Sequence, residues 1–177
     1  MQKILITGMA GSGKSTICNE LERLGCASFA IEDMEGMFNI YHKGTRNFFE
    51  GYSNLNPKDI ENAEWLCDTK KLKELVDSQE NEMGFYCGVS SDINELLPFF
   101  DIVFVLKADA KILNERLKNR EGTDNIGNNQ EGRDIILNRK DEWEKQMEEK
   151  HAIFVDANKN PDQVVKEIIN KVANIKR

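Results

Sequence analysis

Short apolar runs alternate along the chain with longer stretches in which apolar residues recur every three or four positions. Runs bounded by charged residues, glycine or proline are typical of buried strands, and the longer stretches are typical of amphipathic helices. Strands that alternate with helices predict an α/β fold with a parallel sheet. The five expected strands lie at about residues 4–6, 28–31, 84–87, 102–106 and 152–155.

The same pattern predicts the helices that join these strands. The first helix covers about residues 13–24. A second starts after Asp109, which can cap it, and the last starts at Pro161, because proline is tolerated in a first helical turn. The charge-dense stretch 140–150 is interpreted as a solvated helix that turns Trp143 inward and has no functional role.

A long insertion, about residues 34–82, separates the second and third expected strands. We interpret it as a helix, an aromatic-rich loop and a charged helix. We expect this insertion to select the substrate.

The segment 8–16 reads Gly-Met-Ala-Gly-Ser-Gly-Lys-Ser-Thr and matches the phosphate-binding pattern G-x-x-x-x-G-K-[S/T]. It lies between the first expected strand and the first expected helix, as the motif requires. Its backbone N–H groups and the helix dipole favour phosphate oxygens, so the chain is predicted to bind a nucleoside triphosphate. Lys14 is expected to reach the β- and γ-phosphates, and the Ser15 hydroxyl to ligate Mg²⁺. The residues assigned to the donor are Gly8, Ala10, Gly11, Ser12, Gly13, Lys14, Ser15 and Thr16.

Composition and charge narrow the class of protein. The 177 residues are expected to form one domain, residues 1–177. A net charge of −7 argues against an extended nucleic-acid surface, which needs clustered Lys and Arg. No apolar run reaches the roughly 18 residues of a membrane span, and no signal peptide is evident, so we expect a cytoplasmic protein. The four cysteines lack a C-x-x-C spacing and are interpreted as reduced thiols.

The order of these features resembles the small P-loop kinases, a group that includes nucleoside monophosphate kinases, shikimate kinase and gluconate kinase. The features are the phosphate loop, an acidic end of the second strand, a helical insertion, an Arg-bearing helix and a glycine-containing loop. The resemblance covers nearly the whole chain. It implies a three-layer fold with strand order 2-3-1-4-5, a lid at about residues 120–133 and a monomer that uses ATP and Mg²⁺.

Asp33-Met34-Glu35 follows the second expected strand, where some of these kinases carry a D-x-D pair. Phosphoryl transfer needs Mg²⁺ held against the phosphates and benefits from a carboxylate that orients or deprotonates the acceptor. Asp33 is predicted to hold metal-bound water or to act as the base, and Glu35 to assist or to contact the acceptor. The alternative is that Asp33 only caps the following helix.

Arginines flank the polar segment that resembles a lid. Arg116 and Arg120 lie four residues apart and so share a helical face, and Arg133 follows the glycines of the segment. A closing lid delivers arginines to the negative charge of the transferred phosphate while it excludes water. Arg120 and Arg133 are the predicted catalytic arginines, and Arg116 and Arg120 are also assigned to nucleotide binding. The alternative is that Arg120 and Arg133 are surface arginines that flank a flexible polar loop.

Ala157 and Asn158 follow the last expected strand, where similar kinases wrap backbone around adenine. Asn158-Lys159 also resembles the start of the N-K-x-D motif with which GTPases read guanine. The position that requires the guanine-reading aspartate is Pro161, so this alternative fails on spacing.

The acceptor site is the part of the protein that the sequence predicts least clearly. Arg46 is a candidate anion clamp, and Phe48, with neighbouring aromatic residues, could line a pocket or fill the core. Gly88 lies after the third expected strand, where similar kinases place a substrate-facing loop. His42 has no neighbouring ligand type and is interpreted as a packed or exposed histidine.

The predicted function is transfer of the ATP γ-phosphate to a small acceptor, for which a nucleotide is the first candidate. A hydroxy acid or sugar is the second candidate. The competing class is a regulatory or interaction protein that hydrolyses ATP slowly and uses lid motion as its output. Acceptor-stimulated turnover separates these classes.

Overall fold

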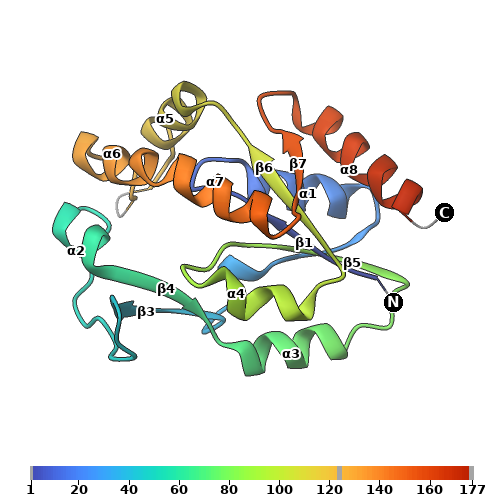
Figure 1. Ribbon diagram of the computed structural model, residues 1–177, viewed down its shortest axis with the longest axis horizontal. Coiled ribbons are helices and arrows are strands. Elements are labelled where there is room, and N and C mark those ends of the chain that lie inside the picture. Colours follow the sequence, from blue (N-terminus) through green and yellow to red (C-terminus); the bar gives the residue numbers. More distant parts are fainter. Residues whose placement is uncertain (1, 123–124, 176–177) are drawn as a thin grey trace.

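The computed structural model describes residues 2–122 and 125–175. Its centre is a five-stranded parallel sheet in the order β2-β5-β1-β6-β7 (Figure 1). Counted among the strands of this sheet, the order is 2-3-1-4-5, so the predicted fold class and topology are confirmed. The strands are β1 (Gln2–Thr7), β2 (Ala27–Ala30), β5 (Met83–Cys87), β6 (Ile102–Lys107) and β7 (Ile153–Asp156).

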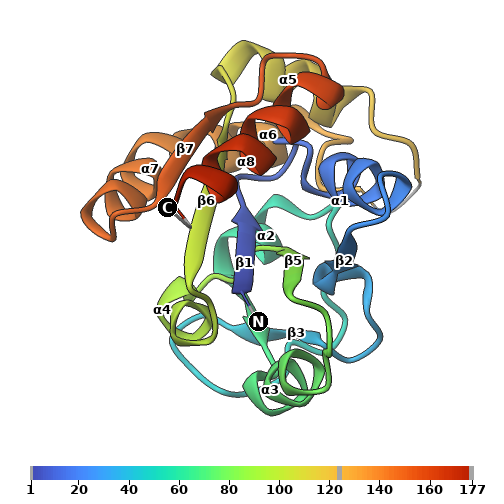
Figure 2. The same ribbon diagram turned by 90° about the vertical axis from the view of Figure 1, so that its right-hand side faces the viewer.

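Helices cover both faces of the sheet and give the molecule three layers (Figure 2). Successive residues of a strand point to opposite faces, so Ile4 and Ile6 join one core while Leu5 joins the other. The first core is completed by α1 (Lys14–Arg23), α5 (Ala110–Lys118) and α8 (Pro161–Ile175). The second is completed by α3 (Thr69–Asp77), α4 (Ile93–Leu96), η2 (Leu97–Phe99) and α7 (Lys140–Glu149). None of the helices within residues 2–122 and 125–175 is long and apolar enough to cross a membrane.

The insertion differs from its prediction in its first half. After the 3₁₀ turn η1 (Ile31–Asp33), the chain forms β3 (Phe38–His42), which pairs antiparallel with β4 (Ala63–Cys67). The prediction of a helix after residue 34 is wrong, because Gly36 takes a φ of 67° and Phe38–His42, which includes Phe38, Ile40 and Tyr41, forms a strand. A short helix, α2 (Pro57–Asn62), precedes β4. The predicted charged helix is present as α3.

The segment predicted as the lid leads into a helix that packs on the insertion. α5 ends at Lys118, and α6 (Gln130–Asn138) begins after a loop in which Thr123 and Asp124 lie outside the described residues. Asn125 is 6% exposed and donates to the carbonyl of Arg120 at 2.9 Å. Figure 1 shows α6 beside α2. After the gap, Asn125 and Gly127 are therefore packed against the rest of the molecule, whereas Glu121 and Gly122 before it are exposed.

Glycine is required within this segment at position 127. A Cβ added to Gly127 would lie 2.0 Å from the carbonyl oxygen of Leu117, which is far inside van der Waals contact. The loop thus passes directly against the last turn of α5. This close approach positions the loop before α6 against the end of α5.

Candidate active site

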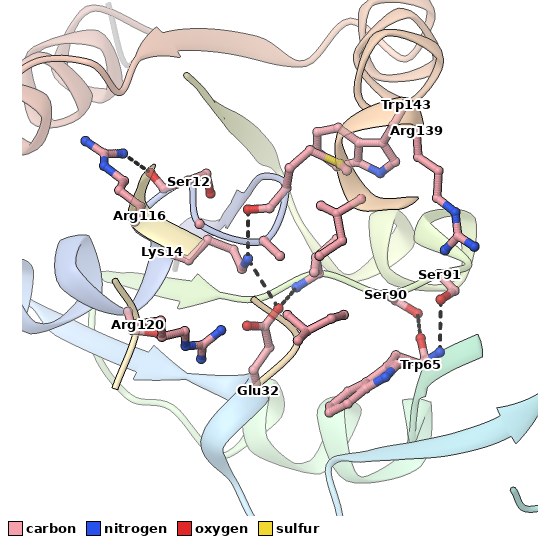
Figure 3. A pocket seen from close by; sticks show the side chains of 18 of the residues that line it. Ser12, Lys14, Glu32, Trp65, Ser90, Ser91, Arg116, Arg120, Arg139 and Trp143 are labelled. Carbon is pink, nitrogen blue, oxygen red and sulfur yellow. Dashed lines mark hydrogen bonds and ion pairs between the residues drawn. The ribbon is translucent and has the colours of Figure 1, made fainter. Parts of the chain in front are cut away.

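A cavity of about 1040 Å³ opens at the carboxyl ends of β1, β2 and β5. One end is lined by the phosphate loop, and the other by the insertion and α7 (Figure 3). Ligands of open parallel sheets bind at this edge, next to the point where the strand order reverses. The cavity is therefore the candidate active site.

The phosphate loop has the local geometry of an anion site. Gly11 and Gly13 take φ values of 83° and 101°, and a Cβ on Gly8 would lie 2.9 Å from the carbonyl oxygen of Leu106. Gly13 is the N-cap of α1 and supplies no side-chain hydrogen bond, so the first N–H groups of the helix are uncapped. The hydroxyl of Ser12 is buried and has no hydrogen-bond partner within the described residues. These donors fit phosphate oxygens.

Lys14 and Glu32 meet between the two ends of the cavity. The Lys14 side chain is 7% exposed; its Nζ donates to the carbonyl of Gly8 at 3.0 Å and lies 3.6 Å from Glu32 Oε1. The same Glu32 oxygen accepts a hydrogen bond from the backbone N–H of Val89 at 2.6 Å. Sequence reasoning missed Glu32, although it is the residue immediately before Asp33. Its position after the second strand was the available signal.

The predicted carboxylates Asp33 and Glu35 have different surroundings. Asp33 is exposed and lines the cavity, whereas Glu35 is exposed and is not among the lining residues. The capping alternative for Asp33 is wrong, because η1 ends at Asp33 and the next α-helix, α2, is capped by Asn56. Asp33 remains a candidate for holding metal-bound water.

Arg116 on α5 contacts the phosphate loop, and Arg120 follows the end of this helix. Arg116 donates to the carbonyls of Ser12 at 3.3 Å and Ala157 at 2.9 Å, and so ties the phosphate loop to the segment after β7. Arg120 is exposed and lines the cavity (Figure 3). Ala157 also lines the cavity. Asn158 does not; its side chain accepts from the N–H of Asp109 at 3.0 Å.

Arg133 lies away from the cavity in this structure. Its side chain donates to Asn114 Oδ1 at 3.0 Å, to the carbonyl of Gly127 at 2.6 Å and to Gln130 Oε1 at 2.6 Å. It is 8% exposed and is not among the lining residues. The structure therefore shows Arg133 in a structural position, and its role on the transferred phosphate stays a prediction.

The predicted acceptor residues are not brought together. Arg46 forms an ion pair with Glu95 and lies outside the cavity lining. Gly88 is buried beneath Ile31, which a Cβ would approach to 2.6 Å, while the three residues after it do line the cavity. Phe48 is 62% exposed, also outside the lining.

Other side chains form the acceptor end. They come from β4, from the loop before α2, from α7 and from the residue between α6 and α7, and they include both tryptophans of the chain. Tyr52 is one of the aromatic residues that the sequence offered as pocket lining, and the tryptophans were missed because β4 was not predicted and α7 was assigned no function. The residues are Lys43, Tyr52, Trp65, Arg139 and Trp143.

Two cysteines lie behind the phosphate loop. Cys18 is on α1, and its Sγ lies 3.0 Å from Ser28 Oγ. A hydrogen bond from the Cys87 side chain lowers the pKa of Cys18 to about 7, and the same bond, together with burial, raises the pKa of Cys87. Both thiols are buried and neither lines the cavity.

Comparison with known proteins agrees with the fold and the phosphate loop. The AAA domain family matches residues 4–136. An adenylate kinase isoenzyme 6 homolog of Plasmodium falciparum (isolate 3D7) is 33% identical over 131 residues, which cover 71% of this chain and 70% of the relative.

Solved structures of two kinases share the fold. A deoxyadenosine kinase from M. mycoides, with dCMP and dCDP bound, has a TM-score of 0.60 and 21% identity, and the match covers 98% of this chain and 100% of that one. A gluconokinase from Sinorhizobium meliloti 1021 has a TM-score of 0.55 and 17% identity, with 98% and 93% covered. Together with the phosphate loop and the confirmed strand order, these matches show that the chain belongs to the AAA domain family and is a small P-loop kinase.

Proposed function

We propose that this protein transfers the γ-phosphate of ATP to an acceptor that carries a nucleobase. The observation that carries the proposal is one continuous cavity with a phosphate loop at one end and two tryptophans at the other. Lys14 and Glu32 lie between these ends. The cavity volume of about 1040 Å³ is at the upper limit of single-ligand pockets, so it has room for a donor and an acceptor side by side.

The donor end fits ATP with Mg²⁺. Lys14, Arg120 and the buried Ser12 hydroxyl would hold the phosphates, while Ser15 and Asp33 would hold the metal. Among the described residues no cluster of three or more His, Cys, Asp or Glu side chains forms a metal site by itself. The metal would therefore depend on phosphate oxygens for its remaining ligands. When bound, Mg²⁺ neutralises charge that develops on the transferred phosphate.

The position of Glu32 favours a hydroxyl as the attacking group. A hydroxyl must lose its proton as it attacks phosphorus, and Glu32 places a carboxylate beside Lys14 where that proton can be accepted. A monophosphate is already anionic, so a carboxylate at this position would repel it. A nucleoside is therefore the first candidate. A nucleoside monophosphate is the second, because the relative that is 33% identical is named as an adenylate kinase homolog.

An acceptor panel tests the proposal. ATP consumption is measured with adenosine, deoxyadenosine, cytidine, their monophosphates, gluconate and shikimate, and the phosphorylated product is identified by mass spectrometry. We expect a nucleoside to stimulate turnover most strongly. If only gluconate or shikimate stimulates turnover, the acceptor is a sugar or a hydroxy acid and the proposed nucleobase acceptor is wrong. ATP consumption that no acceptor increases would leave a slow regulatory ATPase as the function.

Glu32→Gln is expected to lower kcat by about 10²-fold, because the amide cannot accept the proton of the attacking hydroxyl. The amide oxygen can still accept the N–H of Val89, so the loop is preserved. Asp33→Asn is the matched control in the neighbouring carboxylate. It is expected to raise the Mg²⁺ concentration needed for half-maximal turnover, and excess Mg²⁺ should restore part of the rate. An unchanged kcat in Glu32→Gln would favour a monophosphate acceptor, which needs no base.

A further inference from the structure

A short loop after β5, residues 89–91, is hydrogen-bonded both to Trp65 at the acceptor end of the cavity and to Glu32 beside Lys14. Ser91 N–H and Ser90 Oγ both donate to the carbonyl of Trp65, at 2.8 Å and 3.1 Å. The N–H of Trp65 in turn donates to Ser91 Oγ at 2.9 Å. Two residues earlier, the N–H of Val89 donates to Glu32. The loop 89–91 thus holds both the backbone of Trp65 and the carboxylate beside Lys14.

The Trp65 side chain is placed for contact with a ligand. It is 37% exposed, although the next two residues of β4, Leu66 and Cys67, are 4% and 5% exposed. Figure 3 shows its indole ring extending from β4 into the cavity. Five large hydrophobic side chains are exposed within the described residues, and of these Trp65 alone lines the cavity.

The ring and the backbone of Trp65 are both restrained. Tyr52 meets the indole edge to face, with ring centroids 6.4 Å apart and planes at 80°. The loop 89–91 fixes the backbone by three hydrogen bonds. An exposed aromatic face that is held rigidly loses little conformational entropy when a ligand stacks on it.

We propose that Trp65 is the surface on which the base of the acceptor stacks, and that the loop 89–91 sets the distance between this surface and Glu32. The inference rests on the proposed nucleobase acceptor. It adds a criterion for acceptor selection that the volume of the cavity alone does not supply. The reacting oxygen of the acceptor must reach Glu32 while the base lies on Trp65, so acceptors are selected by the span between base and oxygen.

Tryptophan fluorescence tests the stacking surface without relying on turnover. The chain has two tryptophans, so Trp143→Phe leaves Trp65 as the only indole, and Trp65→Phe leaves Trp143. Adenosine is expected to quench the emission of Trp143→Phe saturably, and gluconate is not. Quenching that survives in Trp65→Phe and is lost in Trp143→Phe would place the base on α7 and overturn the proposal.

Kinetics test the same residue with a matched control. Trp65→Ala is expected to raise the KM for the acceptor about 10- to 100-fold, the range that base stacking on an aromatic side chain supports, with little change in the KM for ATP. Phe48→Ala removes an exposed aromatic ring of the same insertion that does not line the cavity, and should leave both constants unchanged. Melting temperatures establish that the variants are folded. An unchanged acceptor KM in Trp65→Ala would contradict the proposal.

The distance criterion is tested by the double variant Ser90→Ala/Ser91→Ala, which removes both hydroxyls that bind Trp65. Wild-type protein is expected to prefer adenosine about 10- to 200-fold over a homologue whose 5′-hydroxyl is one methylene farther away. The double variant should narrow this ratio to severalfold. A ratio that stays at the wild-type value would overturn the distance criterion. If no nucleobase acceptor stimulates turnover in wild-type protein, it is the proposed function that fails instead.

Discussion

Replacing Lys14 by alanine is expected to lower acceptor-stimulated ATP turnover by roughly 10³-fold or more, the range seen when a cation that stabilises a transferred phosphate is removed. The Lys14 ammonium is buried at the mouth of the phosphate loop and lies between the carbonyl of Gly8 and the carboxylate of Glu32. Without it, the Glu32 carboxylate faces the transferred phosphate with no cation between them. The loss should therefore appear in kcat more than in the affinity for ATP.

Lys166→Ala is the matched control for this measurement. Lys166 is exposed on α8 and lies outside the candidate active site, so its loss should change neither turnover nor stability. Both variants are compared by a coupled assay of ADP release and by thermal unfolding. Turnover within tenfold of wild type in a folded Lys14→Ala protein would remove the phosphate loop from catalysis. It would contradict the kinase and the regulatory ATPase alike.

The sheet and the phosphate loop were predictable because their signals are local. Ile4, Leu5 and Ile6 are consecutive apolar residues that join the two cores in alternation, and such a run is legible without knowledge of its partners. The signal of the phosphate loop is equally local, since its glycines and Lys14 lie within one short segment of the sequence, residues 8–16. Strand order came from the resemblance to known kinases.

The insertion was not predictable in the same way. β3 pairs with β4, whose partner residues lie about 25 positions away, so Ile40 lies opposite Trp65 only after the intervening chain has folded. Aromatic residues around position 40 fit a packed helix, a loop or a strand equally well in sequence. The cavity wall that contains Trp65 therefore depends on a long-range pairing that no local pattern specifies.

The acidic end of β2 shows how one residue changes an assignment. The D-x-D resemblance directed attention to Asp33 and Glu35, but the 3₁₀ turn of η1 brings Glu32 to Lys14 and leaves Glu35 exposed outside the cavity lining. Helix boundaries of this kind depend on a single hydrogen bond in a short turn. The sequence pointed to this acidic turn, but of its two named carboxylates only Asp33 lines the cavity, and Glu32 was overlooked.

Arg120 and Arg133 were predicted to act together on the phosphate, and paired methionine variants separate their roles. Arg133→Met is expected to lower the free energy of unfolding by about 2–4 kcal/mol, because it breaks three hydrogen bonds of a buried charged group and removes a donor from the Gly127 carbonyl. For a chain of this size, that loss corresponds to a fall in melting temperature of roughly 5–15 °C. Arg120→Met should leave the melting temperature unchanged, since Arg120 is exposed, and should reduce turnover.

Calorimetry and steady-state kinetics on the same two proteins decide between the alternatives. A lowered melting temperature in Arg133→Met assigns this arginine to the junction between α5 and α6, where it holds the carbonyl of Gly127. The opposite result, unchanged melting with a large loss of kcat, would mean that Arg133 leaves its three partners during the reaction. In that case α6 would have to move as a lid, and the catalytic role predicted from the sequence would be restored. Arg120 already lines the cavity, so the fall in kcat of Arg120→Met is the reference with which the fall in kcat of Arg133→Met is compared.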